Sequence, residues 1–432
     1  MAKAQVSTES YKGVRDFYPE DFAVQQYIFS VWRRTVERFG YAEYGASVLE
    51  YADLYKAKSG EEIVHEQTYT FTDKGGREVS LRPEMTPTVA RMIAAKVKAL
   101  SFPLRWYSIP NLFRYENPQK GRTREHWQLN VDIFGVKNLN AEVEVISLAS
   151  AILRGFGLKD ADFEIQINSR KLTDYLLKDV YALSDTDAHR IAKVIDRKAK
   201  MSTSDFNDQI KEIIPLRGQE FIELMGSKNF EAFVSQLPKE AQAHEGIADI
   251  KMVIDALEKL GITNVFFAQD LMRGFDYYTG IVFEIFDTDT DNRRSLFGGG
   301  RYDDLLSIFG AEPVSAVGFG VGDVVLKEAL LSRGLLPEMK PSADLAVLVL
   351  DEAHIGFAQD LAQKAREGGV RTIVDYSGKK VGDQIKYADK NKVPFVTIVG
   401  EEEVKTGKLK VKNLATGQEV EATEETIAEA CK

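Results

Sequence analysis

Residues 126–133 alternate strictly between polar and apolar side chains, and this pattern constrains the fold more than any other feature of the chain. A period of two places successive side chains on opposite faces of a β-strand. The apolar face comprises Trp127, Leu129, Val131 and Ile133, and the polar face comprises His126, Gln128, Asn130 and Asp132. A half-solvated sheet is the simplest interpretation, because antiparallel sheets commonly leave one face in water.

A second pair of polar residues precedes this strand. Arg114 and Glu116 stand two residues apart, so we predict that they share one face of a strand covering 112–116. Residues 117–125 have the composition of a loop, and their cations are Lys120, Arg122 and Arg124. The pattern therefore predicts two antiparallel strands joined by a basic loop. Their polar face could bind an anionic group and a hydrogen-bond donor at once.

Length and composition restrict the class of protein. A chain of 432 residues with 44% hydrophobic and 28% charged residues is typical of a soluble protein with two or three domains. No apolar run approaches the ~20 residues of a membrane span, and the N-terminus lacks the apolar core of a signal peptide. The single cysteine, Cys431, excludes an internal disulfide and fits a reducing cytoplasm. A net charge of −10 argues against general nucleic-acid affinity but allows a local basic groove.

The five histidines show no helical pairing, so we predict no tightly bound metal. The order of elements predicts an α+β fold, because antiparallel strands are interspersed with helices rather than alternating with them regularly. Charged helical segments interrupt this region, and a parallel α/β unit with a hairpin and a closing helix follows Pro341. The predicted boundaries are 1–171 and 258–335 for the two parts of the core, 172–257 for a helical insertion and 341–432 for the α/β domain.

Two segments place polar side chains at turns. Glu84 and Thr86 stand where a strand ends and a helix begins, so Glu84 could accept from an ammonium group or simply oppose the helix dipole. In LMRGFDYYTG, Arg273 offers a planar fork for phosphate or carboxylate, and two tyrosines follow it. The alternative is a core turn in which Arg273 pairs with Asp276.

Two glycine-rich segments, 297–300 and 318–322, are predicted to be turns where backbones approach closely. The second lacks the GxGxxG of a dinucleotide loop, and Asp323 after it is predicted to cap a helix. Near the C-terminus, Lys379 and Lys380 lie among tyrosines, a combination that suits unstacked RNA bases or an ordinary solvated face.

Together these segments resemble the class II aminoacyl-tRNA synthetases and, within that class, the histidine-specific branch. FRYENPQKGRTREHWQLNVDIFG is similar to motif 2, and LRPEMTPTVAR to the segment that binds the amino acid's ammonium group. LMRGFDYYTGIVFE and GGGRYDDL resemble signatures of the histidine-specific enzymes, and KGVRDFYPED also matches. The resemblance implies a class II antiparallel sheet with flanking helices, and an anticodon-binding role for the C-terminal α/β domain.

The resemblance implies a ligase that converts histidine and ATP to histidyl-adenylate and pyrophosphate, then transfers histidine to the 3′ end of its tRNA. ATP would enter with Mg²⁺, and the enzyme would be a cytoplasmic homodimer with motif 1 near residues 20–50. The implied catalytic residues are Arg114, Arg273 and Gln128. Histidine would be bound by Glu84, Met85, Thr86, Arg114, Gln128, Asp132, Arg273, Tyr277, Tyr278 and Tyr302. ATP would be bound by Arg114, Glu116 and Arg122, and tRNA by Arg122, Arg124, Lys379 and Lys380.

The chain departs from the family pattern at two positions. Asp132 is one methylene shorter than the glutamate of many bacterial members. Val325 occupies the position of the motif 3 arginine, which packs on the adenine and reaches the γ-phosphate. Arg333 is a poor substitute, since it lies eight residues on and about 80° around a helix from Val325.

Two other functions fit parts of the pattern. A synthetase-like paralogue could bind histidine and regulate histidine biosynthesis without charging tRNA, but such chains usually lack the C-terminal domain and the LMRGFDYYTG signature. A class II enzyme for another amino acid, such as threonine or proline, would not need Asp132 together with Arg273 and Tyr278, which suit an imidazole.

Overall fold

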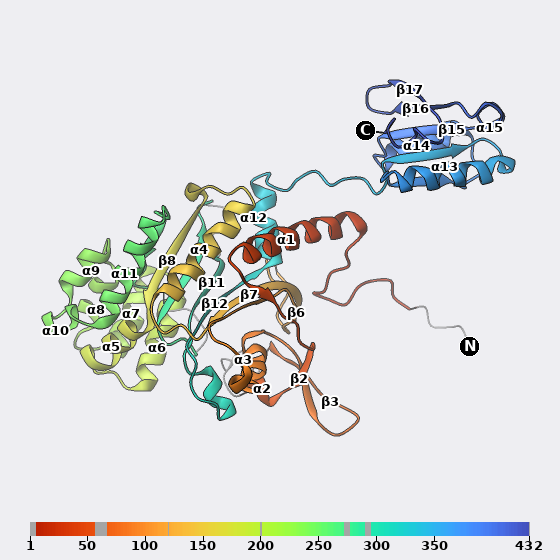
Figure 1. Cartoon of the computed structure of the whole chain (residues 1–432). Coiled ribbons are helices and arrows are strands. Elements are labelled where there is room, and N and C mark those ends of the chain that lie inside the picture. The colour runs from red at the N-terminus through yellow and green to blue at the C-terminus, as the bar shows by residue number, and fades with distance from the viewer. Residues whose placement is uncertain are drawn as a thin grey trace. The chain divides into compact units, whose positions relative to one another are not determined.

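The alternating residues form β7 (Glu125–Phe134), which lies inside a large, mostly antiparallel sheet. The computed structural model describes residues 6–56, 67–119, 121–198, 201–271, 277–289 and 295–431. Within them the sheet has nine strands in the order β1-β5-β7-β12-β11-β10-β8-β9, with β6 also paired to β7 (Figure 1). The other strands are β1 (Ala42–Glu43), β5 (Leu104–Ser108), β6 (Asn111–Phe113), β8 (Phe163–Ser169), β9 (Val265–Phe267), β10 (Ile281–Asp287), β11 (Ser295–Arg301) and β12 (Ala316–Gly322).

The apolar face of β7 packs on helices, as its pattern predicts. Leu129, Val131 and Ile133 are buried in the main core together with α1 (Pro19–Arg38) and α4 (Asn140–Gly155). The helix α12 (Asp323–Ser332) follows β12 directly and also contacts β7. This packing fixes the backbone of β7, so the side chains on its other face are held in place as well.

A smaller sheet carries the Glu84 segment. It has the order β2-β4-β3, formed by β2 (Leu49–Tyr51), β3 (Tyr69–Thr72) and β4 (Glu78–Leu81), and α2 (Asp53–Lys56) follows β2. The predicted hairpin is confirmed, since the Asp73 carboxylate accepts from the backbone N–H groups of Gly75 and Arg77 at 2.8 and 2.9 Å. The chain then enters α3 (Thr86–Ala94), with a 3₁₀ turn (Val97–Ala99) after it.

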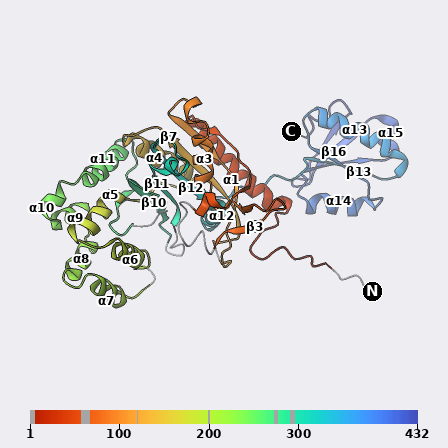
Figure 2. The ribbon, with the colours of Figure 1, turned by 90° about the horizontal axis from the view of Figure 1, so that it is seen from below.

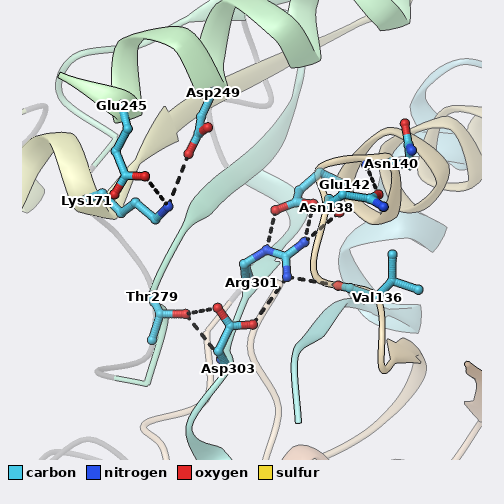
Figure 3. Close-up of polar contacts among 10 residues, drawn as sticks. All are labelled: Val136, Asn138, Asn140, Glu142, Lys171, Glu245, Asp249, Thr279, Arg301 and Asp303. Carbon is cyan, nitrogen blue, oxygen red and sulfur yellow. Dashed lines mark hydrogen bonds and ion pairs between the residues drawn. The ribbon is translucent and has the colours of Figure 1, made fainter. Parts of the chain in front are cut away.

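Helices fill the segment between β8 and β9. They are α5 (Arg170–Tyr175), a π-helical turn (Leu176–Val180), α6 (Asp185–Asp196), α7 (Thr203–Ile213), α8 (Gly218–Met225), α9 (Phe230–Gln236), α10 (Lys239–Gln242) and α11 (Glu245–Lys259). Helices α6 to α10 gather beyond the β8–β9 edge of the sheet in both ribbon views (Figures 1 and 2). Lys171 links α5 to α11 through Glu245 and Asp249, at 3.2 and 3.4 Å (Figure 3).

The chain divides into two compact units between Leu336 and Pro337. In the second unit the sheet order is β14-β13-β15-β16-β17, parallel across the first three strands. Side chains of β13 alternate between α13 on one face and α14 on the other, which is the predicted α/β arrangement. The elements are β13 (Leu345–Val349), α13 (Ile355–Glu367), β14 (Thr372–Asp375), α14 (Val381–Lys390), β15 (Phe395–Val399), α15 (Glu401–Thr406), β16 (Leu409–Asn413) and β17 (Glu419–Ala422).

Several local predictions were wrong. The two glycine-rich segments are strands β11 and β12, not turns. Glycine is needed there because a Cβ at Gly298 would come within 2.6 Å of the Phe283 carbonyl oxygen, and one at Gly320 within 2.8 Å of the Gln128 side chain. The closing helix is absent, since residues 424–431 form turns.

Two predictions about strand and helix ends also failed. Strand β6 stops at Phe113, so Arg114 and Glu116 follow the strand instead of sharing its face. The backbone turns away there, and the N–H of Glu116 donates to the Arg114 carbonyl at 2.8 Å. Asp323 is the first helical residue of α12 rather than its cap, and Gly322 takes the cap position. No helix within the described ranges is long and apolar enough to cross a membrane.

Candidate active site

The polar face of β7 forms one wall of a pocket, and the inner half of this face is buried. Asn130 and Asp132 are only 6% and 3% exposed. The other walls come from the start of α3, from residues 277–278 and from the glycine-rich strands. The lining residues are Glu84, Thr86, Arg114, Gln128, Asn130, Asp132, Tyr277, Tyr278, Gly298, Tyr302, Gly318, Phe319 and Gly320.

Asp132 is a buried carboxylate at the inner end of the polar row. The hydroxyl of Tyr302 donates a hydrogen bond to its Oδ1. A Cβ at Gly318 would overlap with the same oxygen, so glycine in β12 leaves room for the carboxylate. Burial raises the pKa of Asp132 from 3.8 to about 7, although the bond from Tyr302 opposes this rise. A ligand that donates a hydrogen bond here would favour the ionised form.

Glu84 is a second buried carboxylate, 3% exposed, at the entry to α3. The Tyr277 hydroxyl donates to its Oε2 at 3.3 Å. Burial, followed by the charge of Glu84, raises the pKa of Tyr277, so this tyrosine stays a neutral donor. Met85 next to Glu84 is fully buried and does not line the pocket.

Arg114 supplies the positive charge of the pocket. Its Nε donates to the Pro83 carbonyl at 2.9 Å, which ties the guanidinium to the segment that carries Glu84. Gln128, on the polar row of β7, lines the same pocket as Arg114. The Asn130 side chain donates to the Gln128 backbone carbonyl at 3.1 Å. The residues that line the pocket thus combine two carboxylates with one arginine and two neutral amides.

The sequence placed Asn130 and His126 on this polar row but did not assign them to the site; Asn130 lines the pocket, whereas His126 is not among the lining residues. Asn130 belongs to the alternating face, so the period of two was the signal that could have identified it. His126 follows Gln128 outward, and burial together with the charges of Arg114 and Arg15 lowers its pKa to about 3. Its imidazole is therefore neutral at physiological pH.

The structure places the other predicted residues differently. Glu116 and Arg122 pair at 3.6 Å beside the pocket, without lining it. Arg124 is 7% exposed, donates to the Glu116 carbonyl at 3.0 Å and lies over the Tyr115 ring, so its guanidinium is held within the chain, and its contact with tRNA stays a prediction. Arg273 lies outside the described residues.

Lys379 and Lys380 belong to the second unit. Both side chains are exposed just before α14, and Tyr376 and Tyr387 are exposed in the same unit. Exposed aromatic rings with nearby cations can stack on unpaired bases. Across the described residues, no group of three or more His, Cys, Asp and Glu side chains could hold a metal ion.

A buried ion pair supports the Asp132 end of the pocket. Arg301, next to Tyr302, contacts both oxygens of Glu142 in α4 at 2.6 Å (Figure 3). The same guanidinium donates to the Val136 and Asn138 carbonyls at 3.1 Å and to Asp303 at 3.3 Å. These bonds fix the end of β11, and with it the tyrosine that donates to Asp132.

Comparison with known proteins matches both units. A family model described as Histidyl-tRNA synthetase covers residues 13–323, and one described as Anticodon binding domain covers 344–432. The chain is 42% identical to Histidine--tRNA ligase of Leptospira biflexa over 419 residues, covering 96% of this chain and 95% of the relative. It is 38% identical to Histidine--tRNA ligase of Halobacterium salinarum over 414 residues, covering 95% of each.

Solved structures show the same fold. Histidyl-tRNA synthetase from Nostoc sp. PCC 7120 has a TM-score of 0.82 at 22% identity and covers 99% of both chains. A Bacillus halodurans protein described as an ATP phosphoribosyltransferase regulatory subunit/histidyl-tRNA synthetase has a TM-score of 0.74 at 26% identity, covering 89% of this chain and 97% of its own.

The antiparallel sheet, the pocket on its polar face and the anticodon-binding unit define a class II aminoacyl-tRNA synthetase. Within that class, the chain belongs to the histidyl-tRNA synthetase family.

Proposed function

We propose that this chain ligates histidine to tRNA. It activates L-histidine with ATP to histidyl-adenylate and pyrophosphate, and then transfers the histidyl group to the 3′ end of its tRNA. The observation that carries this proposal is a single pocket in which Glu84, Asp132, Arg114 and Gln128 meet. These side chains match the ammonium, imidazole and carboxylate groups of histidine in charge and hydrogen bonding.

Histidine binding follows from the partners that the pocket offers. Glu84 accepts from the ammonium group, with Thr86 and Tyr277 beside it. Asp132 accepts from an imidazole N–H, and Tyr278 supplies a hydroxyl to the same ring. The pKa of Asp132 is about 7, and a hydrogen bond from an imidazole N–H favours the ionised carboxylate. Binding of the imidazole donor therefore displaces a proton from Asp132 wherever the carboxyl is protonated.

Activation is an in-line displacement at phosphorus. A carboxylate oxygen of histidine forms a bond to the α-phosphorus of ATP, and the bond to the pyrophosphate oxygen breaks. Arg114 and Gln128 line the same pocket. They would contact the histidine carboxylate and the α-phosphate, and Arg114 would neutralise the charge that develops there. Such a reaction needs positioning and fixed cations more than covalent catalysis.

The remaining roles rest on the family resemblance and stay predictions. Arg273 would contact the α-phosphate opposite Arg114, while Glu116 and Arg122 would bind ATP. ATP would enter as its magnesium complex. Lys379 and Lys380 would contact the anticodon part of the tRNA, and Arg122 its acceptor end. A homodimeric state and a cytoplasmic location are also predictions.

Histidine-dependent ATP–pyrophosphate exchange without tRNA tests the first step. We expect exchange that requires histidine and is lost in Arg273→Ala and in Asp132→Asn. Arg154→Ala is the matched control, because Arg154 makes an exposed ion pair with Asp160 at 2.8 Å away from the pocket lining. Binding of histidine without exchange would contradict ligase activity and favour the regulatory paralogue.

A further inference from the structure

Gln384 is a polar side chain buried inside the anticodon-binding unit. It is 1% exposed, although most other polar residues of α14 are exposed. Its Nε2 donates to the Val349 carbonyl at 2.8 Å and to the Lys379 carbonyl at 2.7 Å. Its Oε1 accepts from the Val349 N–H at 3.0 Å. A buried amide that uses both its donors and its acceptor holds the backbone around it in one arrangement.

The two bonds to Val349 take the place of a strand that has ended. β14 stops at Asp375, one register position short of Val349. The Leu350 N–H donates to the Val399 carbonyl on β15 at 3.0 Å. The N–H and carbonyl of Val349 therefore point to the opposite side, toward the line of β14. Buried backbone groups need partners, and the Gln384 amide supplies both, as a peptide group of β14 would.

The bond to Lys379 fixes the turn that joins β14 to α14. This turn comprises residues 376–380. At its start, Asp375 Oδ1 accepts from the Ser377 N–H at 2.7 Å. In its middle, Ser377 Oγ accepts from the Lys379 N–H at 3.3 Å. Near its end, the Lys379 carbonyl accepts from Gln384, so the turn is anchored to the end of β13 through one side chain.

Lys379 and Lys380, in this turn, do not serve the local structure. Neither side chain forms an ion pair within the part of the chain that the structure describes. Both lie at the N-terminus of α14, where the helix dipole disfavours cations. Tyr376 and Tyr387 in the same unit are 59% and 56% exposed. Unpaired cations near exposed aromatic rings suit an RNA partner, with phosphates for the cations and bases for the rings.

The place of the turn in the sheet agrees with a binding role. After β13 the chain enters α13 on one face of the sheet, and after β14 it enters α14 on the other face. Open α/β sheets bind ligands at the carboxyl ends of neighbouring strands whose connections diverge in this way. Gln384 bridges these two strand ends, since it bonds to the last residue of β13 and to the turn after β14.

We propose that Gln384 is a positioning residue for tRNA binding. It is buried and contacts no RNA itself. It holds the turn 376–380 so that Lys379 and Lys380 reach RNA phosphates together. The inference rests on the proposed function, because it takes the two lysines as tRNA contacts.

The test measures binding of a histidine-acceptor tRNA transcript to the full chain by filter retention, from about 50 to 200 mM salt. Gln384→Met has nearly the same size and cannot make the three hydrogen bonds. It is compared with the double variant Lys379→Ala/Lys380→Ala and with the combination of all three changes. Leu361→Ala is the matched control, because it removes a fully buried side chain of α13 in the same unit, on the face opposite α14.

Gln384→Met should weaken tRNA binding about tenfold. It should also reduce the salt dependence, although it removes no charge. Each lysine–phosphate contact contributes about 0.7–0.9 to the slope of log K against log salt, so the slope should fall by about 1–2, as in the double variant. Adding Gln384→Met to the double variant should change neither quantity, since the cations that it positions are gone. Leu361→Ala should keep the affinity and slope of the wild type.

Weaker binding of Gln384→Met with the wild-type salt slope would mean a purely structural role and would overturn the proposal. Full additional weakening in the double variant, unchanged affinity of Gln384→Met, or wild type that does not bind tRNA would overturn it as well. If Gln384→Met does not fold, Gln384→Glu is judged by the same measurements, because it keeps an acceptor for the Val349 N–H and loses both donors.

Histidine-dependent exchange without tRNA reports separately on the proposed function. Wild type that binds tRNA without catalysing exchange would contradict the ligase, while the salt slopes would still decide the role of Gln384.

Discussion

Replacing Asp132 with asparagine should stabilise the folded chain while removing its activity. The pKa of this carboxyl is about 7 in the folded chain, compared with an ordinary value of 3.8. Below pH 3.8 the Asp132 carboxyl is protonated in both the folded and the unfolded chain, so it does not lower the free energy of unfolding. As the pH rises toward 7 the unfolded chain loses the proton first, and stability falls until the folded carboxyl ionises too.

The size of this effect follows from the two pKa values. Moving a pKa from 3.8 to about 7 corresponds to about 4 kcal/mol of stability lost across the whole range. Part of that loss has already occurred at pH 5, so about 2–3 kcal/mol should be lost between pH 5 and pH 8. Asparagine has nearly the same size, can still accept from Tyr302 and carries no charge. The variant should therefore lack this pH-dependent loss.

Urea denaturation of wild type and Asp132→Asn at pH 5, 6, 7 and 8, without histidine, measures the difference. Tryptophan fluorescence is the suitable probe because Trp32, Trp106 and Trp127 all lie in the first unit. The stability advantage of the variant should grow by about 2–3 kcal/mol over this range. The reasoning would be refuted if the two proteins changed in parallel with pH, since Asp132 would then ionise normally in the fold.

Three further predictions concern the groups around Asp132. Arg114→Ala should lower the rate of histidine-dependent exchange about 10²–10³-fold through loss of transition-state charge stabilisation, with an unchanged melting temperature. Tyr302→Phe should raise the KM for histidine about tenfold. It should also shift the pH dependence of histidine binding upward, because the hydrogen bond from Tyr302 lowers the pKa of Asp132, and a pH series of KM values checks this. Arg301→Met should cost about 3–5 kcal/mol in urea denaturation by leaving Glu142 charged and unpaired, and adding Glu142→Leu should recover part of that loss.

Local patterns in the sequence identified the elements that have a clear period or turn signal. The alternation of 126–133 predicted both faces of β7, and the Asp73–Gly76 segment predicted the hairpin between β3 and β4. The glycine-rich strands could not be recognised in the same way. Glycine adds no side chain to either face, so residues 297–300 give little periodic signal. Glycine is required in this strand because neighbouring backbone and side chains approach it closely.

Contacts between distant parts of the chain were also hidden from the sequence. Asp323 meets a partner 308 positions away in Arg15, and Arg301 meets Glu142 at a separation of 159. Helix-capping rules favour Asp323 as a cap, but its carboxylate instead accepts from Arg15 and from the Trp127 backbone N–H. Arg114 was identified as a site residue on the expectation that it shares a strand face with Glu116. It reaches the pocket from beyond the strand end instead.

Charging of unfractionated tRNA tests the central claim most directly. The purified chain would be incubated with MgATP, tRNA and each of the twenty amino acids in radiolabelled form. The account predicts acid-precipitable label with histidine alone, which is lost when Asp132→Asn replaces the wild type. No labelling with histidine, or labelling with a different amino acid, would contradict the assignment of this pocket to an imidazole substrate.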